Sequence, residues 1–284
     1  MAPFRAVTAA AILTLAGSIP AQTQIRQEPG ATPWVEVHAA RVRLVGGQPG
    51  IGGAAYVVGL EIALADGWKT YWRMPGDSGV PPSFDWGGSR NLQAASVLYP
   101  APARLPEAGG EAIGYKGVVL LPISVTPQNP ALPVSLKLVL EFGICRDICI
   151  PSTATLGLDL VPARTAAPPG ALLAAIERVP RPHHSRRAND PELKRVRIAE
   201  AGSATLEIEG IFKGSAHKAD VFVEAPEGLY VPIPKQRAAE EGADNVIRFE
   251  SELSPSLAKD LRGKTLTLTL VDDAGASEAR WTFP

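Results

Sequence analysis

The sequence predicts an all-β protein, in which a β-sandwich is followed by a second, smaller β-rich domain. Short runs that alternate between apolar and polar residues recur along most of the chain, as expected of half-buried strands. Turn-forming residues separate these runs, and the 284 residues include 27 glycines and 27 prolines. The length suits two domains of ordinary size. The alternation, the turns and the length therefore favour two β domains.

The first domain is predicted to span residues 32–162. Runs that are expected to form strands occupy residues 35–45, 54–65, 117–123, 134–142 and 153–160. Shorter candidate strands lie at residues 69–72, 83–86 and 95–99. The stretches at 46–50 and 75–82 are rich in glycine and proline, so they are predicted to be loops. Many short strands with such breaks between them are typical of a sandwich.

Residues 163–191 are predicted to be a linker that contains one short helix. Alanine and proline dominate residues 161–169, and residues 170–179 form the one good helical run, which ends before Pro180. The second β-rich domain is predicted to span residues 192–284. Its mostly alternating runs lie at residues 206–209, 220–224, 245–249 and 265–270.

Residues 1–21 are predicted to be a secretory signal peptide. Arg5 supplies positive charge, residues 6–17 are mostly apolar, and small residues allow cleavage after Ala21 or Ala16. The apolar stretch is too short to span a bilayer, and no later stretch approaches about 18 uninterrupted apolar residues. We therefore expect a periplasmic protein without a membrane span, and an oxidising compartment in which disulfides persist. The alternative is a weakly helical or disordered tail.

The net charge of −1 argues against nucleic acid as a partner and against electrostatic docking to membranes. The sequence contains no glycine-rich phosphate loop and no helical metal motif, so neither a cofactor nor a metal is expected. His183 and His184 are adjacent, which points their side chains in different directions in most backbones. A solvated linker is therefore the favoured interpretation of this pair.

Cys145 and Cys149 are the only cysteines, and they lie between two predicted strands. A disulfide that closes so short a loop contributes only about 2 kcal/mol. In one straight strand their Cα atoms would lie about 13 Å apart, whereas a disulfide requires about 4.4–6.8 Å. The residues between them must therefore turn if the bond forms. A tight, exposed disulfide is the labile kind, which favours a chemical role over an architectural one.

Charged and aromatic residues near the cysteines are candidate modulators. Arg146 could lower the pKa of a neighbouring thiol and Asp147 could raise it, but both could also be solvated turn residues. Four aromatic residues form an aromatic group: Trp68, Tyr71, Trp72 and Trp86. This group could face a partner, although packing in the sandwich core is favoured.

Several separated motifs occur in order along the first domain. They are WKTYW at residues 68–72, PGDSG at 75–79, PP at 81–82, GYKG at 114–117, LP at 121–122 and GICRDICIP at 143–151. With them, residues 68–160 resemble the periplasmic N-terminal domain of the thiol:disulfide interchange protein DsbD and of its relative ScsB. The cysteine spacing is closer to the ScsB type.

The resemblance implies an immunoglobulin-like sandwich that carries electrons by thiol–disulfide exchange. It implies that Cys145 and Cys149 are the redox pair, and we favour Cys149 as the sulfur of the mixed disulfide. In the family a loop shields the cysteines; here it corresponds to residues 106–115, which lack the family's Phe-Tyr pair and are rich in glycine. Tyr115, at the end of this loop, is expected either beside the disulfide or in the core.

The resemblance also implies partners. The donor is expected to be a thioredoxin-like or membrane thiol–disulfide protein acting in trans, because this chain carries neither of those parts of the full-length family members. The acceptors are expected to be periplasmic proteins with disulfides. One alternative is a non-catalytic binding module with a structural disulfide. Another is a copper-related protein in which two thiolates bind Cu(I), although Met74 is the only other sulfur after removal of the signal peptide.

Overall fold

The structure is a computed structural model of the chain. It describes residues 30–49, 56–76, 79–107, 110–162, 170–201, 203–226, 228–237 and 245–284. The predicted signal peptide at residues 1–21 lies outside these ranges, as do residues 163–169 of the predicted linker.

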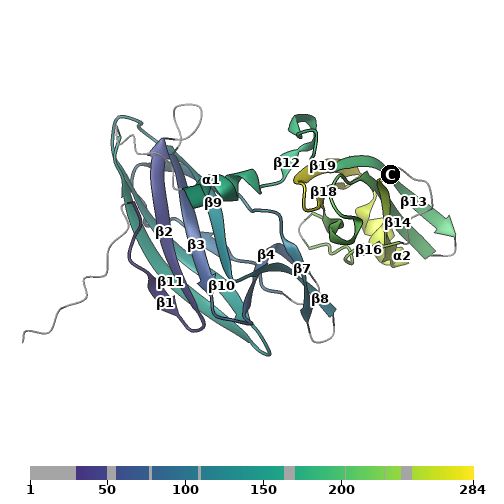
Figure 1. Cartoon of the computed structure of the whole chain (residues 1–284), viewed down its shortest axis with the longest axis horizontal. Coiled ribbons are helices and arrows are strands. Elements are labelled where there is room, and N and C mark those ends of the chain that lie inside the picture. Colours follow the sequence, from purple (N-terminus) through teal and green to yellow (C-terminus); the bar gives the residue numbers. More distant parts are fainter. Residues whose placement is uncertain are drawn as a thin grey trace, which may run out of the picture.

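Two antiparallel sheets form the first domain (Figure 1). The first sheet has the order β1-β2-β3-β9-β6, with β1 at Val35–Val37, β2 at Ala40–Pro49, β3 at Tyr56–Leu64, β9 at Val118–Pro127 and β6 at Leu92–Val97. The second has the order β11-β10-β4-β8-β7, with β11 at Cys149–Leu160, β10 at Val134–Cys145, β4 at Lys69–Gly76, β8 at Gly110–Lys116 and β7 at Ala103–Glu107. The short strand β5, Ser83–Asp85, also pairs with β10.

The core of the first domain lies between these sheets. Every second residue of β3 and β10 points inward, so Leu60 and Leu138 are fully buried in one cluster. Trp72 is the largest fully buried side chain, and Trp68 and Trp86 pack against the same cluster. These three tryptophans therefore pack in the core, which was the favoured role for the aromatic group. Burying one large apolar side chain stabilises the fold by about 1.5–3 kcal/mol.

The second domain also has two sheets, each with four strands. One has the order β12-β19-β18-β15, with β12 at Arg181–Pro182, β19 at Ala276–Thr282, β18 at Thr265–Val271 and β15 at Asp220–Glu224. The other has the order β13-β14-β17-β16, with β13 at Glu192–Ala201, β14 at Ser203–Ile211, β17 at Val246–Leu253 and β16 at Lys235–Gln236. A separate core cluster fills this domain, and helix α2, Pro255–Leu261, begins after the N-cap Ser254. The predicted all-β fold class is confirmed.

Between the two domains runs helix α1, Gly170–Glu177, beside β9 (Figure 1). The helix occupies most of the predicted helical run at 170–179. His183 and His184 follow in a short 3₁₀ turn, η1, His183–Ser185, where His184 is exposed and His183 is half-buried. Within the described ranges, no three His, Cys, Asp or Glu side chains gather in a way that would hold a metal ion.

The two domains pack against each other through strand β4. The ring centroids of Trp72 and Phe222 lie 5.8 Å apart, and Phe222 belongs to the core cluster of the first domain. Next along β4, the Nη2 atom of Arg73 lies 2.6 Å from carboxylate oxygens of both Glu224 and Glu278. Strand β4 thus joins the cysteine-bearing sheet to the second domain.

Candidate functional site

A disulfide joins Cys145, the last residue of β10, to Cys149, the first residue of β11. The two residues are register partners at the end of the β10–β11 hairpin, and their Cα atoms lie 4.1 Å apart. The backbone N–H of Arg146 donates to the carbonyl oxygen of Ile148, at 3.1 Å. The turn that a disulfide at this spacing requires is therefore present.

The two cysteines differ in exposure. Cys145 is only 1% exposed and clusters with Leu105 and Ala112 beneath the turn. Cys149 is exposed, and its neighbour Ile148 is 67% exposed at the tip of the hairpin. An incoming thiolate can therefore approach Cys149, while the surrounding side chains cover Cys145.

Tyr71 is the tyrosine at the disulfide. Its hydroxyl oxygen lies 3.1 Å from the Sγ atom of Cys149, and the hydroxyl donates to Oε1 of Glu107, also at 3.1 Å. Glycines make room for its ring. A Cβ atom on Gly79 would lie 2.6 Å from the ring and one on Gly143 would lie 3.1 Å from it. The ring is therefore confined between two backbone segments.

Lys69 and Glu107 complete this side of the site. Lys69 lies two residues before Tyr71 on β4, so both side chains point to the same face of the sheet. The Nζ atom of Lys69 lies 2.9 Å from Oε1 of Glu107 and donates to the carbonyl oxygen of Pro106 at 3.2 Å. Lys69 is also the register partner of Cys145. The disulfide thus borders a nearly buried ion pair, whose hydrogen bonds offset part of the cost of burial.

The pKa of Tyr71 is raised to about 12, first by burial of the ring and then by the charge of Glu107 and the hydrogen bond to it. Tyr71 consequently keeps its proton at neutral pH. Its hydroxyl can donate one hydrogen bond, either to the Glu107 carboxylate or to a thiolate at Cys149.

Arg146 and Asp147 lie in the exposed turn. They form an ion pair at 3.0 Å, with 53% and 83% of their side chains exposed. The guanidinium of Arg146 also lies over the ring of Trp68, 5.1 Å from its centroid. Solvent screens such exposed charges. Both side chains therefore lie in the kind of surroundings expected of solvated turn residues.

Tyr115 lies in the core, on the other face of the sheet from the disulfide. It pairs with Thr70, whereas Cys145 pairs with the preceding residue, Lys69, so the two side chains point to opposite faces. Its hydroxyl donates to the carbonyl oxygen of Pro100 at 2.7 Å, and burial raises its pKa well above the usual value. Of the two positions expected for Tyr115, the structure shows the one in the core.

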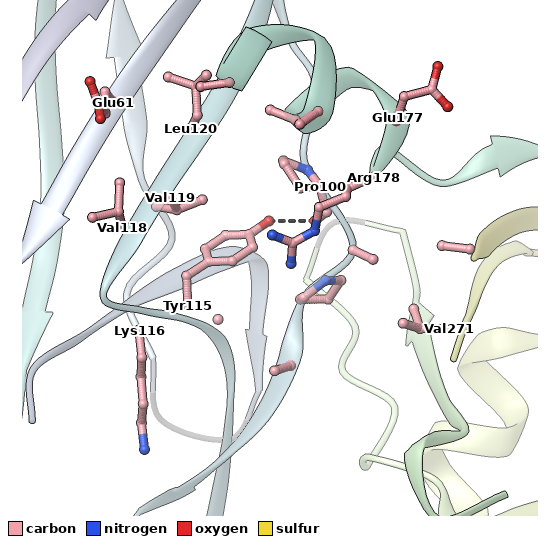
Figure 2. Close-up of a pocket in the computed structure, with 18 of the residues that line it drawn as sticks. Glu61, Pro100, Tyr115, Lys116, Val118, Val119, Leu120, Glu177, Arg178 and Val271 are labelled. Atoms are coloured by element: carbon pink, nitrogen blue, oxygen red, sulfur yellow. Dashed lines mark hydrogen bonds between the residues drawn. The ribbon is translucent and has the colours of Figure 1, made fainter. Parts of the chain in front are cut away.

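Tyr115 and Pro100 border a cleft of about 1410 Å³ between the domains, which Figure 2 shows together with Arg178 and Val271. Neither cysteine lines this cleft, and neither does Tyr71. The sulfurs and Tyr71 therefore lie outside the cleft, although Leu105, which clusters with Cys145, is part of its lining.

The predicted loop at residues 106–115 proves to be largely the hairpin of β7 and β8. The loop was expected from the family resemblance; Pro106 is accommodated in β7 because β7 is an edge strand, where proline is tolerated. Lys69 and Glu107 were not predicted as site residues from the sequence, and Tyr71 was assigned only to the aromatic group and to the WKTYW motif. The spacing of Lys69 and Tyr71 was an available signal, since residues two apart in a strand share a face.

Comparisons with known proteins find matches for both domains. Residues 51–159 match the family described as "Thiol:disulfide interchange protein DsbD, N-terminal", and residues 178–284 match one described as "Domain of unknown function (DUF8393)". No curated protein matches the chain in sequence. A solved structure, the N-terminal periplasmic domain of ScsB from Proteus mirabilis, matches with a TM-score of 0.69 and 24% identity. The match covers 89% of this chain and 98% of that one.

Fold and site together define an all-β protein whose first domain is an immunoglobulin-like sandwich with a disulfide at the end of one hairpin. The first domain matches the DsbD N-terminal family over residues 51–159, so the resemblance found in the sequence is confirmed. The likeness in fold to ScsB extends over the second domain, for which the sequence offered no recognisable motif. No helix in the described part of the chain is long and apolar enough to cross a membrane.

Proposed function

We propose that the chain is a periplasmic thiol–disulfide exchange protein with Cys145 and Cys149 as its redox pair. It would accept reducing equivalents from a thioredoxin-like or membrane-borne dithiol protein and pass them to periplasmic proteins that contain disulfides. The observation that carries the proposal is the asymmetric disulfide, in which Cys149 is exposed and Cys145 is buried. The family match of the domain supports the reaction class.

The reaction proceeds in two exchanges. A donor thiolate attacks the Sγ atom of Cys149, forms a mixed disulfide and releases Cys145 as a thiolate. The second donor thiolate then attacks the donor sulfur of the mixed disulfide and releases Cys149. The donor dithiol is oxidised to a disulfide, and two electrons and two protons reach the pair. Transfer to an acceptor reverses the order, with Cys149 attacking and Cys145 resolving.

Tyr71 stabilises the thiolate form of Cys149. In the disulfide state its proton is directed to Glu107, whose charge is balanced by Lys69. When Cys149 becomes a thiolate, the same proton lies within hydrogen-bonding distance of the sulfur. A hydrogen bond to an ionised acceptor is about twice as strong as one between neutral groups, so the thiolate gains most from this donor. Glu107 competes for the proton and repels the thiolate, which sets an upper limit on this effect.

A mainly structural role for the disulfide is less well supported. The bond closes only the turn at the end of one hairpin, and a loop that short contributes only about 2 kcal/mol. The strands on either side are held by twelve register pairs between β10 and β11 in any case.

Single-cysteine variants test the proposal. Cys145→Ala leaves an exposed thiol on Cys149, and Cys149→Ala leaves a buried one on Cys145. Each variant is converted to its mixed disulfide with thionitrobenzoate and mixed with a reduced thioredoxin. We expect rapid release of thionitrobenzoate from Cys145→Ala and much slower release from Cys149→Ala. Equal, slow release from both would contradict the proposal. Stoichiometric Cu(I) uptake by the reduced protein, without exchange, would instead favour the copper-binding alternative.

A further inference from the structure

The second domain contacts the strand that carries Glu107, on the face away from the disulfide. We propose that this domain is a brace that positions Glu107 beside Tyr71 and Cys149, and that Arg104 is the positioning residue through which it acts. The proposal rests on the proposed function of the disulfide and assigns a role to the domain of residues 178–284.

The alternation of side chains along β7 makes this arrangement possible. Leu105 clusters with Tyr71 and Cys145, and Glu107 points the same way, toward the hydroxyl of Tyr71. Arg104 points to the opposite face. One edge strand thus lies between the disulfide site and the second domain, and Figure 1 shows β7 and β8 on the side of the sandwich that is nearer to that domain.

Arg104 fixes this strand to the second domain with several hydrogen bonds. Its Nε and Nη2 atoms donate to the two carboxylate oxygens of Asp220 at 3.1 and 2.6 Å. Nη2 also donates to the carbonyl oxygen of Pro234 at 2.8 Å, and Nη1 donates to Glu111 on β8 at 2.6 Å. Burial alone would lower the pKa of Arg104, but Asp220 and Glu111 raise it above its usual value, so the side chain stays charged. Such a two-pronged arginine–carboxylate pair fixes orientation as well as distance.

β7 is the edge strand of its sheet and has β8 as its strand partner, while β8 pairs in turn with β4. On the disulfide face, Lys69 and Tyr71 contact Glu107, and Lys69 also donates to the carbonyl oxygen of Pro106. Arg104 restrains the strand from the opposite face, so its loss removes a contact that the disulfide face does not supply. The second domain also fits closely near the turn end of the hairpin, where Glu111 pairs with Pro106. A Cβ atom on Gly76 would lie 2.8 Å from the carbonyl oxygen of Glu111 and 3.4 Å from the side chain of Ile233.

Arg73 provides an internal comparison. It also joins the two domains, but it lies on the central strand β4, and among the described residues its hydrogen bonds go to Glu224 and Glu278 rather than to the hairpin. Asp220→Asn and Glu278→Gln are therefore matched variants. Both change a carboxylate of the second domain to an amide of the same shape opposite an arginine of the first, and only one of them opposes Arg104.

The experiment measures the titration of Tyr71 and the reactivity of Cys149. Tyrosine is labelled with ¹³C, the Tyr71 signal is assigned with Tyr71→Phe, and its titration is followed by NMR in the full chain. Alkylation of Cys149 by iodoacetamide is measured in the Cys145→Ala background. If Arg104 positions Glu107, Asp220→Asn lowers the pKa of Tyr71 toward its value in Glu107→Gln and speeds alkylation near neutral pH by about threefold or more. Glu278→Gln leaves both quantities unchanged.

Three outcomes would overturn the proposal. The first is a folded Asp220→Asn protein, or a folded Arg104→Leu protein, in which Tyr71 titrates as in the parent. The second is an equal shift in Asp220→Asn and Glu278→Gln, which would indicate general loosening of the interface. The third is full additivity of Arg104→Leu and Glu107→Gln, because residues that act through one contact do not add. The tyrosine titration requires no exchange partner, so it tests the brace even if the disulfide carries no electrons.

Discussion

The hydroxyl of Tyr71 lies 3.1 Å from the Sγ atom of Cys149, although 78 residues separate them in sequence. The same hydroxyl reaches Glu107, which is paired with Lys69. Three strands of one sheet, β4, β7 and β11, therefore supply the groups that surround the exposed sulfur. The chemistry proposed for the site depends on this tyrosine more than on the charged residues of the turn.

Tyr71→Phe should raise the pKa of the Cys149 thiol. The variant removes the hydroxyl that lies at the sulfur and leaves the ring in place. Losing a hydrogen bond to an ionised group costs about 1.5–3 kcal/mol, which corresponds to a rise of about one to two pKa units. The pH dependence of iodoacetamide alkylation in the Cys145→Ala background measures this change. An unchanged profile would show that Tyr71 does not interact with the thiolate.

Glu107→Gln should lower the pKa of Tyr71 from about 12. The Glu107 carboxylate repels the tyrosinate and accepts the proton of the neutral form, so its removal favours ionisation. Burial, the larger cause, persists, and the pKa should stay above the ordinary value of about 10. Tyr99 serves as the control, because its pKa of about 12 is raised first by burial and has no contribution from Glu107. A shift at both tyrosines would point to a general change in the fold.

Stability should decline as the pH rises through the window set by Tyr71. Its pKa is about 12 in the folded protein and about 10 in an unfolded chain, so the unfolded chain loses its proton first. The stabilisation is complete below about pH 10 and is lost between about pH 10 and 12. Urea unfolding of the parent and of Tyr71→Phe across this range measures it, and a smaller decline is expected in the variant. Identical pH dependence in the two proteins would argue against this.

Gly143→Ala should destabilise the first domain and displace the Tyr71 ring. The added methyl group would lie 3.1 Å from the ring, and overpacking of this kind costs about 1–3 kcal/mol. Gly157→Ala is the matched control on β11, because its methyl group would meet only a carbonyl oxygen at 3.6 Å. Urea unfolding of the two variants gives the comparison. Equal stabilities would mean that the ring is not confined as described.

Much of the fold follows from local patterns. The alternating runs at 134–142 and 153–160 lie within β10 and β11, because alternation over many residues specifies a half-buried strand. The run at 117–123 likewise corresponds to the beginning of β9. The hairpin of β7 and β8 was expected as a loop from the family resemblance; Pro106 lies in its edge strand, where proline is tolerated.

The cysteines of the site could be predicted from the sequence, but the residues that surround them could not. Cys145 and Cys149 stand out as the only cysteines, and their spacing alone requires a turn. Glu107 could not be foreseen, because it reaches Tyr71 only after β8 pairs with β4 and β7 pairs with β8. The contact of Arg104 with Asp220 spans 116 residues, and no local pattern encodes an interface between two domains.

The reduction potential of the Cys145–Cys149 pair tests the central claim most directly. The full chain is equilibrated with glutathione and dithiothreitol buffers of graded potential, and the fraction of disulfide is measured after acid quenching and alkylation. A redox pair in thiol–disulfide exchange should have a potential between about −120 and −270 mV, the range of known thiol carriers. A value below about −300 mV would identify a structural disulfide and contradict the proposed function.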